Sequence, residues 1–198
     1  GGKSWRKNAR IIEGDLEADA SYEDAVLIVK GNVSGKLDSS AGSVHILGDL
    51  RGTLNLTTSA SVVIAGSIAP DASLTSPGSL DVFVGGDVHG TIDCGESQFI
   101  WIHGDLPGTV KTGSPKISLH VMGDYSGAIQ PRDEPALLYV DIRGFAHSAS
   151  MKAIYRFKYT EFKASVRFSD QPPGFYPKRS IMNLTNNWVI HNQRTSEP

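Results

Sequence analysis

This chain of 198 residues has a single cysteine, no long hydrophobic run and almost no net charge, and each shortage excludes a class of protein. One cysteine, Cys94, rules out an internal disulfide framework. The lack of any stretch of about 18 apolar residues rules out a transmembrane helix. A formal net charge of −2 argues against a general nucleic-acid-binding protein. Residues 1–7 are basic without an apolar core, so we expect no secretory signal and a cytoplasmic location.

Signatures of catalysis and of cofactor binding are scarce as well. No two of the six histidines stand at a spacing typical of helical metal ligands, and the cysteine has no cysteine partner. The Gly-x-x-x-Gly segments do not lead into a predicted helix, so they lack the context of a phosphate-binding loop. We therefore expect no cofactor, no metal site and no catalytic residue, and we predict that the chain is not an enzyme.

Glycine, in contrast, is abundant and periodic. The clearest copy of the repeat is residues 84–92, with the sequence Val-Gly-Gly-Asp-Val-His-Gly-Thr-Ile. The unit is a β-branched residue, a free position, glycine, usually aspartate, and an apolar residue, followed two positions later by a second glycine. Units this short cannot bury an apolar face alone, so they must stack coil on coil. The first glycine recurs every 17 to 21 residues, at Gly14, Gly31, Gly48, Gly66, Gly86, Gly104, Gly123 and Gly144.

Apolar residues alternate with polar ones around each glycine. They stand two and four positions before the glycine and two positions after it, and this period of two places them on one side of each strand. That side forms the interior of the stack. Cys94 is expected there as a buried thiol, at a position that Leu56 and Leu74 occupy in other coils. The sequence thus predicts an all-β protein, a β-solenoid of about eight to nine short coils over residues 8–149.

The repeat fades near residue 150. Residues 150–198 are aromatic and mainly basic, whereas the preceding part has more acidic than basic residues. Residues 151–168 fit either one helical face or alternating strands, and we favour strands that form a last imperfect coil. The segment beyond them is apolar enough to pack on the solenoid as a cap, which terminal coils need. Two placements of this segment stay open: at the end of the stack, or folded back over the outward side of the coils.

Outward positions before the glycines concentrate aromatic, histidine and methionine side chains. They would form one flat face, and a contiguous apolar patch of this composition is typical of a protein interface. Within it, His120 and Asp141 would be neighbours in adjacent coils, which is the best constellation for acid–base chemistry in the sequence. The predicted binding residues are Ile28, His45, Leu47, Phe83, Phe99, Trp101, His103, His120, Met122 and Asp141.

Aspartates also recur at one position of the repeat. Asp87, Asp105 and Asp124 directly follow the first glycine in consecutive coils. Stacked carboxylates repel one another, so a cation held between them is one interpretation. The interpretation we favour is that each carboxylate accepts a hydrogen bond from the turn backbone next to its own glycine.

The Gly-x-Val/Leu-x-Gly-x-Leu/Ile units from Gly31 to Ile129 resemble those of bactofilins, the polymer-forming bacterial cytoskeletal β-helices. The resemblance covers half of the chain. It implies a right-handed β-helix that is cytoplasmic, needs no nucleotide and assembles end to end. This sequence departs from it in the aromatic, basic C-terminal segment and in the apolar character of its outward positions.

Three functions fit these features. The first is a non-enzymatic scaffold that binds another protein, or further copies of itself as a homo-oligomer, through the aromatic face or the coil ends. The second is an immunity-type inhibitor that binds a toxin through the same face. The third is a carbohydrate-active β-helix enzyme that uses His120 and Asp141, although such grooves usually cluster several carboxylates. We expect the first, with a protein partner, no nucleic acid and no transmembrane segment.

Overall fold

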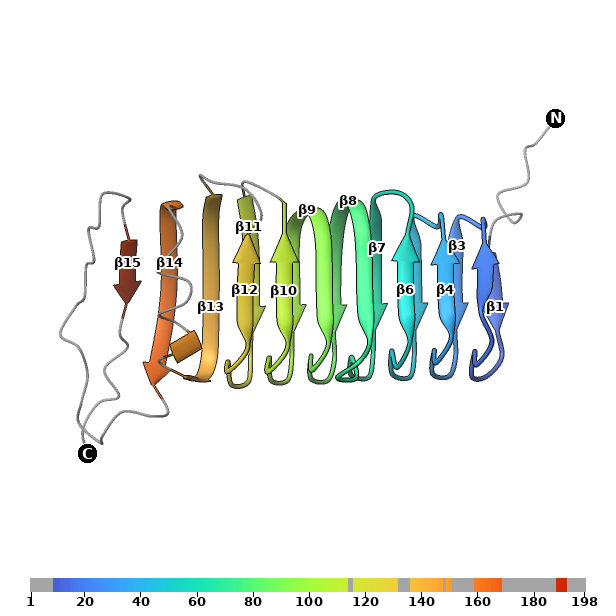
Figure 1. Ribbon diagram of the computed structural model, residues 1–198, viewed down its shortest axis with the longest axis horizontal. Helices are drawn as coiled ribbons and strands as arrows, with labels where there is room; N and C mark the ends of the chain where they lie inside the picture. Colours follow the sequence, from blue (N-terminus) through green and yellow to red (C-terminus); the bar gives the residue numbers. More distant parts are fainter. Residues whose placement is uncertain are drawn as a thin grey trace.

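A computed structural model confirms the all-β prediction, because stacked parallel strands form a β-solenoid (Figure 1). It describes residues 9–113, 116–131, 136–147, 149–150, 159–168 and 188–191. The strands are β1 (Ala9–Ile12), β2 (Ala20–Tyr22), β3 (Val26–Val29), β4 (Lys36–Ser39), β5 (Ser43–Ile46), β6 (Thr53–Leu56), β7 (Ala60–Ile64), β8 (Ser73–Val84), β9 (Thr91–Ile102), β10 (Thr109–Thr112), β11 (Lys116–Val121), β12 (Ala128–Pro131), β13 (Ala136–Ala146), β14 (Tyr159–Phe168) and β15 (Trp188–His191).

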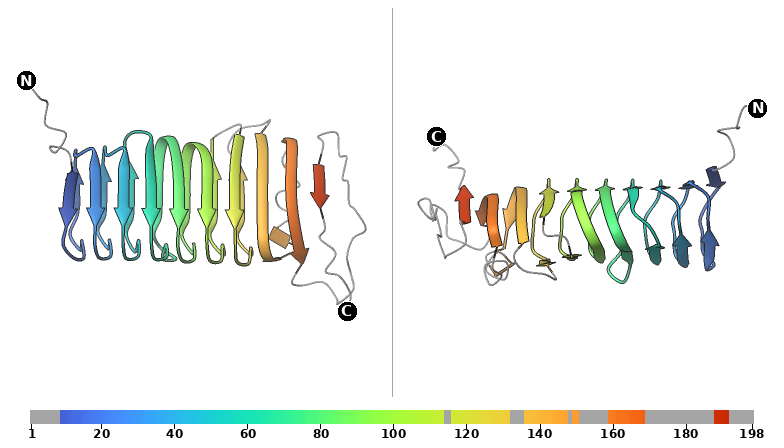
Figure 2. Two further views of the ribbon diagram at one scale, coloured as in Figure 1. Left: turned by 180° about the vertical axis from the view of Figure 1, so that it is seen from behind. Right: turned by 90° about the horizontal axis from the view of Figure 1, so that it is seen from above.

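The strands form two parallel ladders that run along the stack. One ladder joins β1, β3, β5, β7, β8, β9, β11, β13, β14 and β15 in that order. The other joins β2, β4, β6, β8, β9, β10 and β12. The long strands β8 and β9 take part in both ladders, because each passes from one side of the coil to the other. Figure 2 shows the coils in a single row, with β1 at one end and β15 at the other.

The core lies between the ladders and consists of the inward residues that the alternation predicted. One inward row shows the pattern: its members pair in register from coil to coil and are almost completely buried. Among the described residues, Tyr125 is the largest fully buried side chain, and burial raises the pKa of its hydroxyl above the ordinary value. The inward row that pairs in register from coil to coil consists of Leu27, Val44, Val62, Val82, Ile100, Leu119 and Val140.

Cys94 is buried, as predicted, but its predicted register is partly wrong. The ladder pairs Cys94 with Ser76, whereas Leu74 pairs with Ile92. The cause is a turn at Pro70 that adds two residues to this coil before the strand begins. Proline has no N–H with which to continue the ladder, so the chain turns at this point.

The first glycine of each unit is required by close stacking of the coils. A Cβ atom at Gly104 would meet Asp87 Oδ1 and the Gly86 carbonyl of the preceding coil. The second glycine has the same constraint, because a Cβ atom at Gly108 would meet the backbone of the coil before it. At Gly14, in the first described coil, a Cβ atom would meet nothing within 4 Å. The repeated glycines therefore mark the places where neighbouring coils touch.

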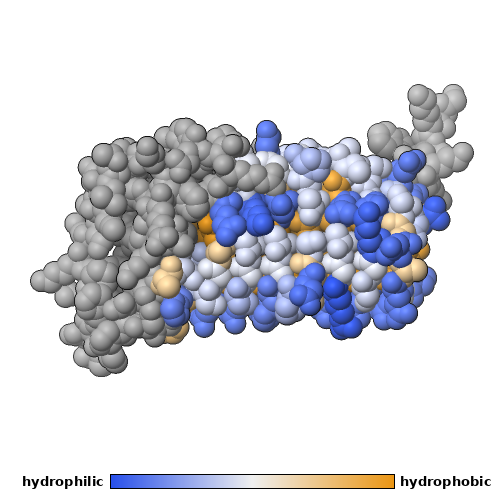
Figure 3. Space-filling model, in the orientation of Figure 1, coloured by the Kyte–Doolittle hydropathy of each residue, from blue (hydrophilic) through white to orange (hydrophobic). Residues whose placement is uncertain are grey.

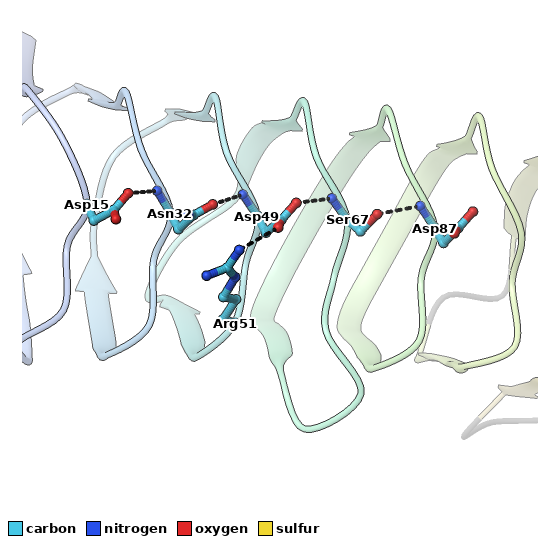
Figure 4. Close-up of polar contacts among 6 residues, drawn as sticks. All are labelled: Asp15, Asn32, Asp49, Arg51, Ser67 and Asp87. Atoms are coloured by element: carbon cyan, nitrogen blue, oxygen red, sulfur yellow. Dashed lines mark hydrogen bonds and ion pairs between the residues drawn. The ribbon is translucent and has the colours of Figure 1, made fainter.

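The residue after the first glycine forms a hydrogen-bond ladder along the stack. Asp105 Oδ1, for example, accepts a hydrogen bond from the backbone N–H of Asp124 in the next coil at 2.7 Å. The favoured interpretation of the aspartates is thus right about backbone hydrogen bonding and wrong about the donor, which belongs to the following coil. Figure 4 follows this ladder through Asp15, Asn32, Asp49, Ser67 and Asp87.

Strands β14 and β15 extend the solenoid beyond the glycine repeat. β14 pairs in parallel with β13, with register shifts between Ala136 and Leu137 and between Asp141 and Phe145. β15 pairs in parallel with β14. The strand interpretation is therefore confirmed for residues 159–168. The predicted placement of the remaining C-terminal segment falls on residues 169–187 and 192–198, which lie outside the described residues.

Candidate binding face

The solenoid presents two broad outward faces that differ in chemistry. The first, here called the polar face, consists of the outward side chains of β4, β6, β10, β12 and the first halves of β8 and β9. Thr53, Ser73, Thr91 and Thr109 follow one another along its ladder. Figure 3 shows this side of the molecule, where hydrophilic residues predominate among those coloured.

The second, here called the aromatic face, consists of the outward side chains of β3, β5, β7, β11, β13 and the second halves of β8 and β9. Among the side chains that the structure describes, its members alternate with buried residues, so they point away from the core. Phe83 is 41% exposed at the middle of this face. One continuous row of outward residues pairs in register along it: Ile28, His45, Val63, Phe83, Trp101, His120 and Asp141.

Three rings form a cluster on the aromatic face, here called the ring cluster. Phe99 and Trp101 come from β9, and His120 comes from β11, directly opposite Trp101. The Trp101 and His120 rings stack with centroids 5.2 Å apart and planes inclined by 23°. The Phe99 centroid lies 5.3 Å from that of His120 and 6.2 Å from that of Trp101. These contacts orient the rings, while Phe99 stays 40% exposed, so the cluster is ordered and also accessible.

A chain of polar contacts runs beside the ring cluster. Ser118 Oγ lies 3.1 Å from His120 Nε2, and His120 Nδ1 lies 3.6 Å from Asp141 Oδ2. Asp141 Oδ2 also accepts a hydrogen bond from Arg143 Nε at 2.9 Å. The structure thus places His120 opposite Asp141, as the sequence predicted. Sequence reasoning did not select Ser118 or Arg143, although each stands two residues from a selected residue and so shares its side of the strand.

Three predicted residues lie at the margin of the aromatic face. Leu47, His103 and Met122 each follow the last residue of a strand, in the turn that leads to the repeat glycine. Leu47 is 51% exposed there, and His103 is also exposed. These side chains flank the row of paired outward residues and are not members of it.

The N-terminal part of the aromatic face repeats one element of the polar chain. Ser43 Oγ lies 3.1 Å from His45 Nε2, as Ser118 does from His120. Ile28 and Val63 are the residues paired with His45 in the two neighbouring coils. The two Ser-x-His pairs therefore have the same Oγ–Nε2 distance and differ in their neighbours, since an aspartate faces only the second histidine in the ladder.

Metal ligands are not grouped in the described part of the chain. Among those residues, no three His, Cys, Asp or Glu side chains are placed to hold a metal ion. The stacked aspartates direct their Oδ1 atoms to backbone N–H groups, as Asp87 does to Asp105 at 2.7 Å, and this bonding accounts for their recurrence. Over the same residues, no helix is long and apolar enough to cross a membrane.

Comparison with family models, with curated proteins and with solved structures finds no match to this chain. The strand ladders show a β-solenoid fold, and none of these comparisons supports an assignment to the bactofilins in particular.

Proposed function

We propose that this chain is a scaffold that binds a protein through the aromatic face, either another copy of itself or a different protein. The observation that carries this proposal is the ring cluster of Phe99, Trp101 and His120, which is ordered by mutual stacking and still accessible. Aromatic and arginine side chains are enriched among the residues that dominate binding energy at protein interfaces. Phe83 is paired with Trp101 in the ladder, and Arg143 is bonded to Asp141 beside the cluster, so the same face has further side chains of those types.

The backbone beneath the aromatic face favours binding as well. Every outward side chain stands on a strand whose backbone is paired with both neighbouring coils, as β9 is with β8 and β11. A preorganised surface loses little conformational entropy on association, so more of the contact free energy appears as affinity. A flat and rigid face of this kind suits a partner protein with a complementary flat surface.

Glycan cleavage, the third function that the sequence suggested, is supported less well. Glycosidases place two carboxyl groups about 5–10 Å apart. Asp141 has one such group, and Asp81, another carboxylate of the aromatic face, lies three strands away in the ladder. Three strand spacings amount to about 14 Å, which exceeds the separation that the reaction uses.

Self-association through the face is tested by light scattering on a size-exclusion column over a hundredfold range of concentration. The test compares the wild type with a Phe83→Ser/Phe99→Ser variant and with Thr91→Ala on the polar face as a matched control. If copies bind through the aromatic face, the mass of the wild type and of Thr91→Ala rises with concentration while the double variant stays monomeric.

End-to-end assembly, which the resemblance to bactofilins implies, predicts a different result in the same experiment. Coil ends would carry the contact, so mass would rise equally in all three proteins, and the aromatic face would not be the interface between copies. A constant monomer would point to a different protein as the partner, and an immunity-type inhibitor is one case of this. Photo-cross-linking from the aromatic face tests that alternative.

A further inference from the structure

The polar chain on the aromatic face joins a hydroxyl, an imidazole and a carboxylate in a specific order. Ser118 Oγ is 3.1 Å from His120 Nε2, and His120 Nδ1 is 3.6 Å from Asp141 Oδ2. The two ring nitrogens therefore face two different partners. A carboxylate opposite Nδ1 favours the tautomer with its proton on that nitrogen, which leaves the Nε2 lone pair directed at the serine hydroxyl.

Neighbouring side chains hold this arrangement in place. Trp101 stacks on the imidazole of His120 from one side, and Arg143 Nε donates a hydrogen bond to Asp141 at 2.9 Å on the other. The imidazole and the carboxylate are partly accessible, since the side chains of His120 and Asp141 are each 26% exposed. The imidazole and the carboxylate thus each have a contact that orients them, and both are within reach of a reactant.

We propose that Ser118 is an activated nucleophile that accepts an acyl group from an ester, with His120 as its general base and Asp141 as a positioning residue. This inference goes beyond the binding function proposed above and does not depend on it. Ser118 Oγ would attack the carbonyl carbon while its proton moves to His120 Nε2. The ester C–O bond then breaks, and the leaving alkoxide takes the proton from His120. A water molecule, deprotonated by the same nitrogen, would later hydrolyse the acyl-serine to a carboxylic acid and restore the hydroxyl.

The surroundings of Ser118 indicate the class of ester and the expected rate. Phe99 is paired with Ser118 in the ladder and is 40% exposed, so a flat apolar acyl or leaving group would lie against its ring. The backbone N–H groups of the described strands β9, β11 and β13 serve the parallel ladders and do not form a pair of donors for an oxyanion. We therefore expect acylation of the serine to be faster than hydrolysis of the acyl-serine.

The molecule contains its own control for this proposal. Ser43 and His45 have the same hydroxyl-to-Nε2 distance of 3.1 Å, on the same face and at the same spacing in sequence. The next coil places Val63 opposite His45, where Asp141 stands opposite His120. A difference in reactivity between Ser118 and Ser43 would therefore report the carboxylate and the ring cluster rather than the Ser-x-His spacing itself.

The test treats the full chain with p-nitrophenyl acetate and, separately, with an aryl fluorophosphonate, and quantifies adducts by peptide mass spectrometry. We expect Ser118 to be modified at least about a hundredfold faster than Ser43, which is the lower end of the usual gain from a positioned general base. Ser118→Ala and His120→Asn should abolish the preference while the thermal unfolding curve stays close to that of the wild type. Equal modification of the two serines, or modification of neither, would overturn the proposal.

The positioning role of Asp141 has a separate readout. Imidazole ¹⁵N chemical shifts should show His120 mainly protonated on Nδ1 in the wild type and as a mixture of tautomers in Asp141→Asn. Modification of Ser118 should slow in Asp141→Asn and be largely restored in Asp141→Glu, which keeps the charge. If Asp141→Asn leaves both the tautomer and the rate unchanged, Asp141 does not position His120.

Discussion

The polar face and the aromatic face stand on the same coils and share one core, yet their outward residues have little in common. Along the polar face, hydroxyl side chains such as Thr91 and Thr109 succeed one another from coil to coil. Along the aromatic face, the corresponding row contains Phe83, Trp101 and His120. Because the core side chains point away from both faces, either outward row could be hydrophilic without loss of the fold. Aromatic side chains on one row only therefore point to a role outside stability.

Alternation along each strand separates the outward faces from the core, and two adjacent residues test this separation. Val84 is fully buried, whereas Phe83 beside it is 41% exposed. Val84→Asp buries an unpaired charge and should lower the free energy of unfolding by more than about 4 kcal/mol. Phe83→Asp should change it by less than about 1 kcal/mol. Urea denaturation of both variants measures the difference, and similar losses in the two would show that the assigned strand register is wrong.

A glycine substitution tests whether the stack that supports both faces depends on close contact between the coils. Gly104→Ala would place a Cβ atom against Asp87 Oδ1 and the Gly86 carbonyl and should cost about 1–3 kcal/mol of stability. Gly14→Ala meets nothing within 4 Å and should change stability by less than about 0.5 kcal/mol. Thermal unfolding of the two variants separates them. Equal effects would mean that the glycines are required for some other reason than contact between coils.

The hydrogen-bond ladder of the repeat should contribute less than the glycines. Asp105→Ala removes the acceptor for the N–H of Asp124 and should cost about 1 kcal/mol, because the site is exposed and water can replace part of the bond. Asp105→Asn should cost almost nothing, since Asn32 already accepts the equivalent bond at 2.8 Å. Chemical denaturation decides between these outcomes. A large loss in Asp105→Asn would indicate that the charge itself is needed.

The smallest effect is expected at the margin of the aromatic face. Leu47 is 51% exposed but lies outside the row that contains Phe83 and Trp101. Leu47→Ser should leave both the unfolding midpoint and any concentration-dependent rise in mass unchanged. Light scattering beside the wild type checks this. If Leu47→Ser weakens association as strongly as Phe83→Ser, the binding surface extends into the turn before the glycine.

The fold could be predicted from the sequence because one short unit is repeated, so each coil checks the alignment of the others. The predicted register was wrong in the coil whose length departs from the repeat. The turn at Pro70 adds two residues within one coil, and the equivalence proposed for Leu74 and Cys94 was lost there. The donor to the Asp105 carboxylate could not be predicted either. An aspartate at this position can accept a hydrogen bond from the local turn or from the next coil, and the sequence is the same in both cases.

The candidate site was predicted in part for a similar reason. Periodicity placed Trp101, His120 and Asp141 in one row, and the ladder confirms their order. The periodicity of the sequence did not predict that Ser118 would contact His120 or that Arg143 would contact Asp141, since these contacts depend on side-chain torsions within a strand. Stacking of the three rings likewise depends on ring orientation, which alternation does not encode.

Site-specific photo-cross-linking in the source cell can identify which face of the solenoid contacts a partner. A benzophenone-bearing amino acid replaces Phe83 on the aromatic face in one protein and Thr91 on the polar face in another. We expect a discrete cross-linked protein, a second copy or a different chain, from position 83 and little or none from position 91. Cross-links from position 91 alone, or the same products from both positions, would contradict the assignment of binding to the aromatic face.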